Sequence, residues 1–259
     1  MLHWLLALLI TFGAAYFQRK TGPTVPLAED AAVGRGLLRV VLHRSHGGEG
    51  DQPVVIENAG PEVTGRILWR RYPTREEFRS IELARNGERL EGALPHQPPA
   101  GKIEYRVELT DGSRTVRVPE RGTAVTRFKG AVPAWALAPH VLFMFAAMLF
   151  SNAAGIAALR KETRLAALSW WTAVLLFLGG LLFGPIVQKY AFGSFWTGFP
   201  VGYDLTDNKT LIAFIAWILA LRSLRKGRHA RRFVLAAALV MFAIFLVPHS
   251  LLGSELKPE

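Results

Sequence analysis

The chain contains no cysteine. This absence excludes disulfide bonds, thiolate metal sites, a covalently attached c-type haem, a cysteine nucleophile and an N-terminal lipidated cysteine. Two further patterns are missing from the sequence: a Gly-Lys loop that would hold a phosphate, and the Gly-x-Ser-x-Gly turn that carries a nucleophilic serine. The sequence therefore gives no sign of an ATPase or a serine hydrolase, and we expect the protein not to be an enzyme.

Acidic residues are scarce outside residues 25–131. That segment carries 17 Lys and Arg against 15 Asp and Glu, whereas the rest of the chain carries 14 against 5. The net charge of +11 therefore arises mostly beside the apolar runs. A nucleic-acid-binding protein would instead carry its basic residues as a patch on a folded domain. We exclude nucleic acid as a partner and expect the basic residues to meet membrane lipids.

The N-terminal apolar run, Leu2–Phe17, is compatible with two interpretations. Gly13-Ala14-Ala15 offers the small-x-small pattern at which a signal peptide is cleaved. However, no Lys or Arg precedes the run, and an uncleaved helix of this length would span ~24 Å. We expect a membrane anchor over residues 1–20, followed by a linker over residues 21–34, where Pro, Gly and acidic residues gather.

Residues 35–131 are predicted to form an antiparallel β-sandwich, because short alternating runs recur there. Ile103–Leu109 alternates strictly between apolar and polar residues, as a half-buried strand does, and the hairpin pair Asp111-Gly112 follows it. Tyr105 and Trp69 are the expected core aromatics. The predicted strands are residues 37–42, 52–56, 63–72, 78–83, 103–109 and 115–118.

The segment Leu94–Tyr105 combines a Pro-rich turn with a strand that carries an inward tyrosine. It resembles a segment common in immunoglobulin- and fibronectin-type-III-like modules of exported bacterial proteins. The resemblance implies a sandwich fold. It also implies a role as a spacer or docking module, because most such sandwiches serve in that way.

Residues 132–259 are predicted to form a four-span transmembrane bundle. Val132–Leu159 contains no charged residue, and Leu165–Gln188 is a second clear span. Leu211–Leu221 and Phe233–Val247 are shorter, so each needs neighbouring residues or a bundle that admits water. Together with the anchor, these runs predict an α+β membrane protein with five spans.

The basic residues indicate an orientation. They collect in two gaps between the apolar runs, residues 160–164 and 222–232. Because short cytoplasmic loops retain Lys and Arg, we place both gaps and the N-terminus on the cytoplasmic side of a bacterial inner membrane. The β-sandwich, the loop over residues 189–209 and the C-terminus are then predicted to be periplasmic.

Two histidines are the candidate ligands. His140 lies about two turns into the second span, and His249 directly follows Pro248 at the end of the fifth. Ionisable groups at membrane depth are functional candidates. Two neutral imidazoles on facing helices are a sufficient ligand set for a b-type haem, and together with Asp207 they would form a non-haem metal site. His249 is equally compatible with a helix C-terminus that favours a cation.

The remaining candidates lie in the segment 194–210, which is predicted to return to the same face. Asp204 is compatible with a simple helix N-cap, and Trp196 with an anchor at the membrane interface. The dense polar run that follows is less completely explained by capping. The predicted outer-face polar cluster contains Trp196, Asp204, Asp207, Asn208 and Lys209, beside His140 and His249.

Three functions are compatible with this sequence. The first is a non-catalytic accessory or assembly subunit of a larger inner-membrane complex, whose sandwich docks a partner and whose helices pack beside those of other subunits. The second is a b-type cytochrome with its haem held by His140 and His249. The third is a small transporter that uses the segment 194–210 as a broken helix.

Overall fold

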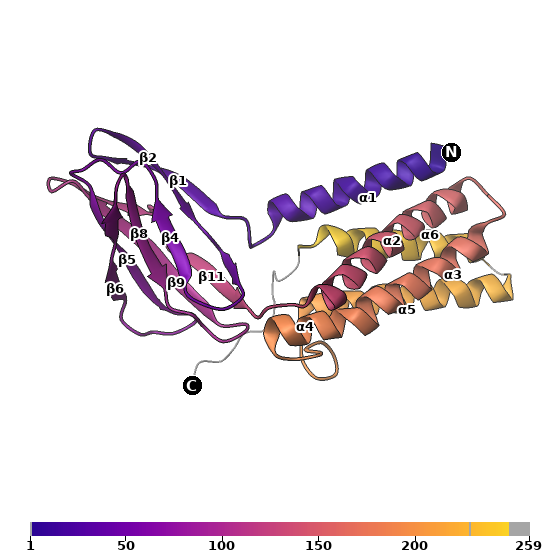
Figure 1. Cartoon of the computed structure of the whole chain (residues 1–259). Coiled ribbons are helices and arrows are strands. Elements are labelled where there is room, and N and C mark those ends of the chain that lie inside the picture. The colour runs from indigo at the N-terminus through magenta and orange to yellow at the C-terminus, as the bar shows by residue number, and fades with distance from the viewer. Residues whose placement is uncertain (1, 228, 249–259) are drawn as a thin grey trace. The chain divides into compact units, whose positions relative to one another are not determined.

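The chain divides into two compact units, which Figure 1 shows in a computed structural model that describes residues 2–227 and 229–248. Of the described residues, the helical unit comprises 2–23, 132–227 and 229–248, and the β unit comprises Thr24–Ala131. The β unit is thus inserted into helical sequence, after the first helix and before the second.

The β unit contains eleven strands in three sheets. One sheet is the hairpin of β1 and β2, a second has the order β4-β8-β7, and the largest has the order β3-β11-β9-β5-β6 with β10 also paired to β9. The strands are β1 (Leu27–Val33), β2 (Gly36–Leu42), β3 (Ser45–Gly47), β4 (Gln52–Ile56), β5 (Thr64–Arg71), β6 (Arg79–Glu82), β7 (Ala84–Asn86), β8 (Arg89–Leu94), β9 (Lys102–Thr110), β10 (Thr115–Val118) and β11 (Ala124–Lys129).

The core of the β unit follows from the period of two along its strands. On β9, the side chains of Ile103, Tyr105, Val107 and Leu109 are all fully buried. The buried Tyr105 hydroxyl requires a partner, and it donates a hydrogen bond to the His43 carbonyl oxygen at 2.7 Å. Tyr105 and Trp69 belong to one hydrophobic cluster that joins strands of all three sheets, so the prediction of these core aromatics is confirmed.

The hairpin after β9 is also confirmed. β9 and β10 pair antiparallel around Asp111-Gly112, and Gly112 has a φ of 89°, a conformation that glycine adopts without strain. The Asp111 carboxylate accepts hydrogen bonds from the backbone N–H groups of Ser113 (3.0 Å), Arg114 (2.9 Å) and Gly34 (3.0 Å). A hydrogen bond from the Ser113 hydroxyl (2.8 Å), together with these backbone bonds, lowers the pKa of Asp111 well below its usual range.

Two details of the predicted β domain are corrected. The expected linker over residues 21–34 contains β1, which pairs along its whole length with β2. Its sequence, Leu-Ala-Glu-Asp-Ala-Ala-Val, has weak strand propensity, and its pairing with β2 overrides that preference. The sheet is also not purely antiparallel, because β3 pairs with β11 in parallel.

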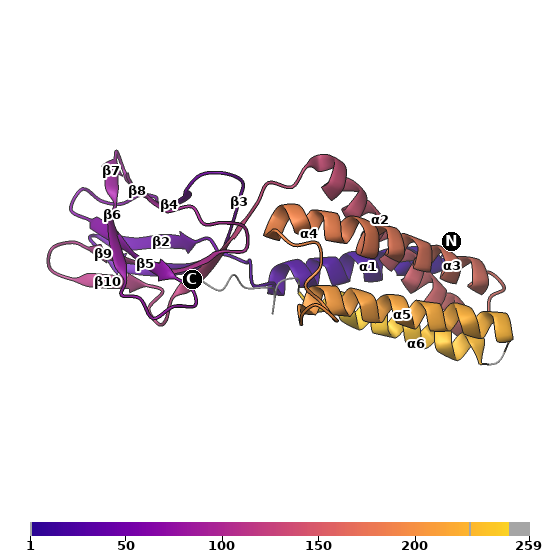
Figure 2. The ribbon, with the colours of Figure 1, turned by 90° about the horizontal axis from the view of Figure 1, so that it is seen from below.

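The helical unit consists of five helices in the described residues, when the three consecutive segments α3, η1 and α4 are counted as one. Figure 2 shows α5 and α6 side by side in this unit, and they contact one another along their length. The segments are α1 (Leu2–Thr21), α2 (Ala134–Leu159), α3 (Leu165–Leu176), the π-helix η1 (Phe177–Phe183), α4 (Gly184–Phe192), α5 (Leu205–Lys226) and α6 (Ala230–Leu246).

Small residues let these helices approach closely. A Cβ atom on Gly155 of α2 would lie 3.0 Å from the Ala238 Cβ of α6, and one on Gly180 of η1 would lie 2.5 Å from the Thr210 Cγ2 of α5. Such contacts are typical of helices that pack without much apolar side-chain volume between them.

Trp217 of α5 is the largest fully buried side chain among the described residues, and its indole N–H donates to the Met241 sulfur of α6 at 3.2 Å.

The predicted division into an N-terminal anchor and a separate four-helix bundle is not supported. α1 packs against α2 and α6 as a fifth member of the helical unit. Its buried residues are Ala7, Thr11 and Ala14, and the Asn152 side-chain amide of α2 donates to the Thr11 hydroxyl at 2.9 Å. A buried polar bond of this kind fixes α1 to α2.

The prediction of five membrane spans is wrong. In residues 2–227 and 229–248, two helices are long and apolar enough to cross a membrane, Ala134–Leu159 and Leu165–Phe192. α6 is too short at 17 residues, and α1 and α5 are not among the helices that are both long and apolar enough. The orientation that rested on five spans, with a cytoplasmic N-terminus and a periplasmic β domain and C-terminus, loses its basis with them.

Candidate functional site at the polar end of the helical unit

The loop between α4 and α5 is held by one carboxylate. Oδ2 of Asp207, which is 6% exposed, accepts hydrogen bonds from the backbone N–H groups of Thr197 (2.7 Å) and Gly198 (3.1 Å) and from the Gln188 amide (3.0 Å). A Cβ atom on Gly198 would lie 2.6 Å from the Asp207 Cβ, so glycine is required for this approach. Asp207 therefore fastens the loop to α4 and α5.

Neighbouring side chains hold the same loop and the start of α5 through further hydrogen bonds. Asp204 is the N-cap of α5, and its Oδ1 accepts hydrogen bonds from the backbone N–H groups of Thr206 (2.7 Å) and Asp207 (3.4 Å). The Asn208 side-chain oxygen accepts from the Phe199 N–H at 2.7 Å, and the Trp196 indole donates to the Phe199 carbonyl at 3.1 Å. Residues 193–204 contain no helix, so the segment 194–210 is an ordered loop followed by a regular helix.

Two side chains from other helices meet the C-terminus of α6. The Lys209 ammonium of α5 donates to the Val247 carbonyl at 2.8 Å. The Gln18 amide of α1 donates to the carbonyls of Phe245 (2.8 Å) and Val247 (3.1 Å). The last carbonyls of a helix lack partners within it, and a cation is favourable beside them. Lys209 and Gln18 thus fasten α5 and α1 to the end of α6.

His140 of α2 makes a single directed hydrogen bond. Its Nδ1 lies 2.8 Å from the carbonyl oxygen of Gly179 in η1. Because a carbonyl only accepts, this contact assigns the ring proton to Nδ1 and leaves Nε2 as an acceptor in the neutral ring. In the described part of the chain, Nε2 has no hydrogen-bond partner.

The π-helix places this carbonyl beside the histidine. The Gly184 N–H bonds to the same Gly179 oxygen, five residues back, and Pro185 follows without an N–H group of its own. A Cβ atom on Gly179 would lie 2.9 Å from the Met144 backbone nitrogen, so η1 contacts α2 almost backbone to backbone. Single π-turns of this type occur frequently at functional sites.

A pocket of about 180 Å³ opens beside His140 between α1, α2 and α6. A second, narrower cleft adjoins it, shares Gln18, Met144 and Phe245 with it, and reaches Lys209 and Thr210. Two members of the predicted polar cluster, His140 and Lys209, therefore line neighbouring spaces. The pocket is lined by Ala15 and Gln18 of α1, by His140, Val141, Met144, Phe145 and Met148 of α2, and by Phe245 of α6.

The predicted haem and metal sites find no support in the described part of the chain. His249, the proposed second ligand, lies outside the described residues. Within residues 2–227 and 229–248, no three His, Cys, Asp or Glu side chains are grouped so that they could hold a metal ion. The haem and the non-haem metal site therefore stay predictions.

Three residues that no sequence pattern singled out complete the network: Gln18, Gln188 and Thr197. Each is a neutral polar residue within or beside an apolar helix, where such side chains usually bond to a neighbouring helix. A polar residue in such a position is a signal in the sequence, but it does not show which residue the side chain bonds to. The contact between His140 and Gly179 joins residues 39 apart in sequence and has no local pattern that predicts it.

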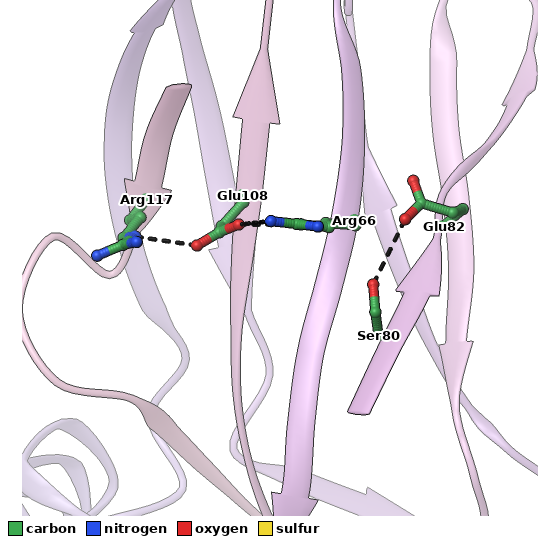
Figure 3. A network of polar contacts seen from close by, with 5 residues as sticks. All are labelled: Arg66, Ser80, Glu82, Glu108 and Arg117. Atoms are coloured by element: carbon green, nitrogen blue, oxygen red, sulfur yellow. Dashed lines mark hydrogen bonds and ion pairs between the residues drawn. The ribbon is translucent and has the colours of Figure 1, made fainter. Parts of the chain in front are cut away.

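The β unit carries a network of charged side chains on the outer face of its largest sheet, which Figure 3 shows in part. Glu108 of β9 lies directly opposite Arg66 of β5 and Arg117 of β10, and it accepts from Arg66 at 2.8 Å and from Arg117 at 2.9 Å. Burial alone would raise the pKa of Glu108, but the hydrogen bonds from the two arginines outweigh it and lower that pKa. Glu108 and the two arginines are therefore paired with one another within the sheet.

A groove of about 530 Å³ lies between β1 and β10. Its two ends are closed by side chains: Asp111 accepts from the Gly34 N–H, and Glu29 accepts from the Glu120 N–H, each at 3.0 Å. Between those ends, no backbone hydrogen bond joins the two strands in residues 24–131. Each strand therefore presents one free edge to the groove.

Comparisons with models of known protein families and with curated proteins find no match for this chain.

Proposed function

We propose that the protein is a non-catalytic accessory or assembly subunit of a membrane protein complex, which packs beside a partner through α1 and docks it through the β unit. The observation that carries this proposal is the outward face of α1. Nine of its large apolar side chains are exposed, and the residues that α1 buries are only Ala7, Thr11 and Ala14.

The exposed residues of α1 are spaced for packing against another helix. Leu2, Leu5, Leu9, Phe12 and Tyr16 recur at intervals of three and four residues, and each is 55–66% exposed. An alternation of three and four places such residues on one stripe, which is the seam of a helix pair. We call this stripe the outer seam. The residues that face the helical unit follow the same spacing on the other side of α1, so α1 is suited to lie between two helical layers.

The surroundings of the outer seam favour an apolar neighbour. A soluble monomer rarely exposes a contiguous apolar patch larger than a few hundred Å², and a larger patch marks a protein or membrane contact. α2 and the continuous helix Leu165–Phe192 supply two candidate membrane crossings in the same unit. A partner helix that covers the outer seam would therefore lie in the same apolar environment as these two helices.

The groove between β1 and β10 supports a docking role for the β unit. An extended peptide recognises a sheet edge through its backbone hydrogen bonds, and side-chain pockets then add specificity. Here the groove provides free edges together with charges of both signs, including Glu29 and Asp30 on β1 and Arg114 just before β10. The expected occupant is an extended segment of the same partner. The predicted resemblance to immunoglobulin-like modules is consistent with this role and stays a proposal.

The proposal is tested by photo-cross-linking in cells. A benzoylphenylalanine probe replaces Phe12 on the outer seam or Val116 in the groove, and both probes are expected to give an adduct with one and the same protein. Leu239 of α6, 59% exposed, and the exposed Glu88 between β7 and β8 are the matched control positions. Adducts at Phe12 that contain lipid alone, or partners that differ between Phe12 and Val116, would contradict the proposal.

A further inference from the structure

The pocket between α1, α2 and α6 has the size of one small ring. An engineered protein cavity of ~150 Å³ with apolar walls binds benzene, and this pocket encloses about 180 Å³. Its walls are largely apolar and adaptable, because Met144, Met148 and two phenylalanines supply most of the lining. Methionine sulfur contacts the edges of aromatic rings favourably. The walls therefore fit a six-membered aromatic ring.

The polar groups at this pocket are hydrogen-bond acceptors. His140 has used its one N–H group on the Gly179 carbonyl, which leaves Nε2 as an acceptor. The Gln18 amide nitrogen donates to the carbonyls of Phe245 and Val247, so the side-chain oxygen of Gln18 remains as an acceptor for a ligand. Neither residue has a donor to offer a ligand. An anion would find no partner here, and a plain hydrocarbon would leave the acceptors unpaired.

We propose that this pocket binds a small phenolic ring, such as a phenol or a hydroquinone headgroup. The ring lies against Met144, Phe145 and Met148, and its hydroxyl donates to His140 Nε2. The Gln18 oxygen accepts from a second donor where the ligand carries one. The bond between His140 and Gly179 has a positioning role, because it fixes both the tautomer and the plane of the imidazole. This inference is independent of the proposed docking function.

The test compares two probes of nearly equal shape, 4-fluorophenol and fluorobenzene, by ¹⁹F NMR titration of the full-length protein in lipid nanodiscs. Empty nanodiscs give the partition of each probe into lipid. The hydroxyl bond is expected to make 4-fluorophenol bind about three- to tenfold more tightly than fluorobenzene. Equal affinities for the two probes would overturn the proposal, because the acceptor would then contribute nothing.

Two variants locate the binding. His140→Phe removes the acceptor and keeps a ring, so the preference for 4-fluorophenol should disappear while fluorobenzene still binds. Ala15→Leu fills the pocket from α1 and leaves His140 in place, so both probes should lose saturable binding. If His140→Phe does not fold, Ala15→Leu decides alone, because binding of 4-fluorophenol that survives it would exclude this pocket. Leu239→Ala, on the exposed face of α6, is the matched control and should bind both probes as the unaltered protein does.

Discussion

The two units of this protein distribute their side-chain volume in opposite ways. In the β unit the large side chains lie inside, where Tyr105, Phe128, Ile67 and Leu109 are at most 1% exposed. In the helical unit the buried positions are mostly small, and large apolar residues such as Leu9 and Phe12 lie outside, each 62% exposed.

The difference between the units indicates their surroundings. Burial of apolar surface away from water stabilises the β unit, since this gain scales with the area removed from water. Helices whose outer side chains are apolar gain little from that effect and depend on close packing and on buried polar bonds. The bonds from Asn152 to Thr11 and from Lys209 to Val247 are of the latter kind. The β unit thus has the side-chain distribution of a domain that folds in water, whereas the helical unit carries large apolar side chains on its outside.

The largest expected effect tests the core of the β unit. Phe128→Ala removes a fully buried ring and should lower the free energy of unfolding by ~3–5 kcal/mol, as measured by urea denaturation of residues 24–131. Leu37→Ala is the matched control, because Leu37 is 71% exposed and its truncation should cost less than ~0.5 kcal/mol. If both substitutions lowered the free energy of unfolding equally, buried and exposed side chains of the β unit would not differ in their contribution to stability.

The packing of the helical unit predicts the next effect. Gly180→Ala places a Cβ atom 2.5 Å from Thr210, so α5 and η1 must move apart, and the expected loss of stability is ~1–3 kcal/mol. Gly13→Ala is the control, because a Cβ atom at Gly13 meets nothing within 4 Å. Thermal unfolding in detergent compares the two variants. A destabilised Gly13→Ala beside an unaffected Gly180→Ala would contradict the packing described for these helices.

The charged network of the β unit predicts a smaller, pH-dependent effect. Because its arginines lower the folded-state pKa of Glu108, the carboxylate stabilises the fold above its unfolded pKa of ~4.3, and this stabilisation is lost as the pH falls through the folded value. Glu108→Gln should therefore cost ~1 kcal/mol at pH 7, since both arginines are at least half exposed, and progressively less below pH 4. Urea denaturation at pH 7, 5 and 3 measures this. A cost that stays constant with pH would exclude the charge as its cause.

The smallest effect on stability is expected at the outer seam, and this prediction separates folding from binding. Leu9→Gln should change the thermal stability of the isolated protein by less than ~0.5 kcal/mol, because Leu9 is 62% exposed. The same change should abolish the cross-link from position 12 to its partner. An isolated protein that unfolds on this substitution would show that Leu9 belongs to the core of the unit itself.

The parts of the fold that a local pattern encodes could be predicted from the sequence. The strict alternation of Ile103–Leu109 and the pair Asp111-Gly112 were sufficient for β9 and for the turn after it. The N-cap at Asp204 follows from its position before an apolar run. By contrast, β1 has a weak strand pattern of its own and depends on β2 for its pairing.

The candidate site was less accessible from the sequence. Hydropathy identifies apolar runs. It does not distinguish a helix long enough to cross a membrane from a shorter helix, or from one that packs against the other helices of the same unit. For this reason five spans were predicted. The π-helix lies where Gly179 approaches α2 and Gly180 approaches α5, and no periodicity signals it. The pocket beside His140 depends on three helices whose order in space is a tertiary property.

The insertion of the β unit after α1 has a consequence for biosynthesis. α1 packs against α2, but the whole β unit is translated between Thr21 and Ala134. At ~5–20 residues per second, the ribosome needs on the order of 6–20 s to make that segment, and the β unit can fold in the meantime. During this interval α1 lacks its inner neighbour, so Ala7, Thr11 and Ala14 are uncovered in addition to the outer seam. We therefore expect a chaperone or a lipid surface to shield the inner side of the first helix until the second helix emerges.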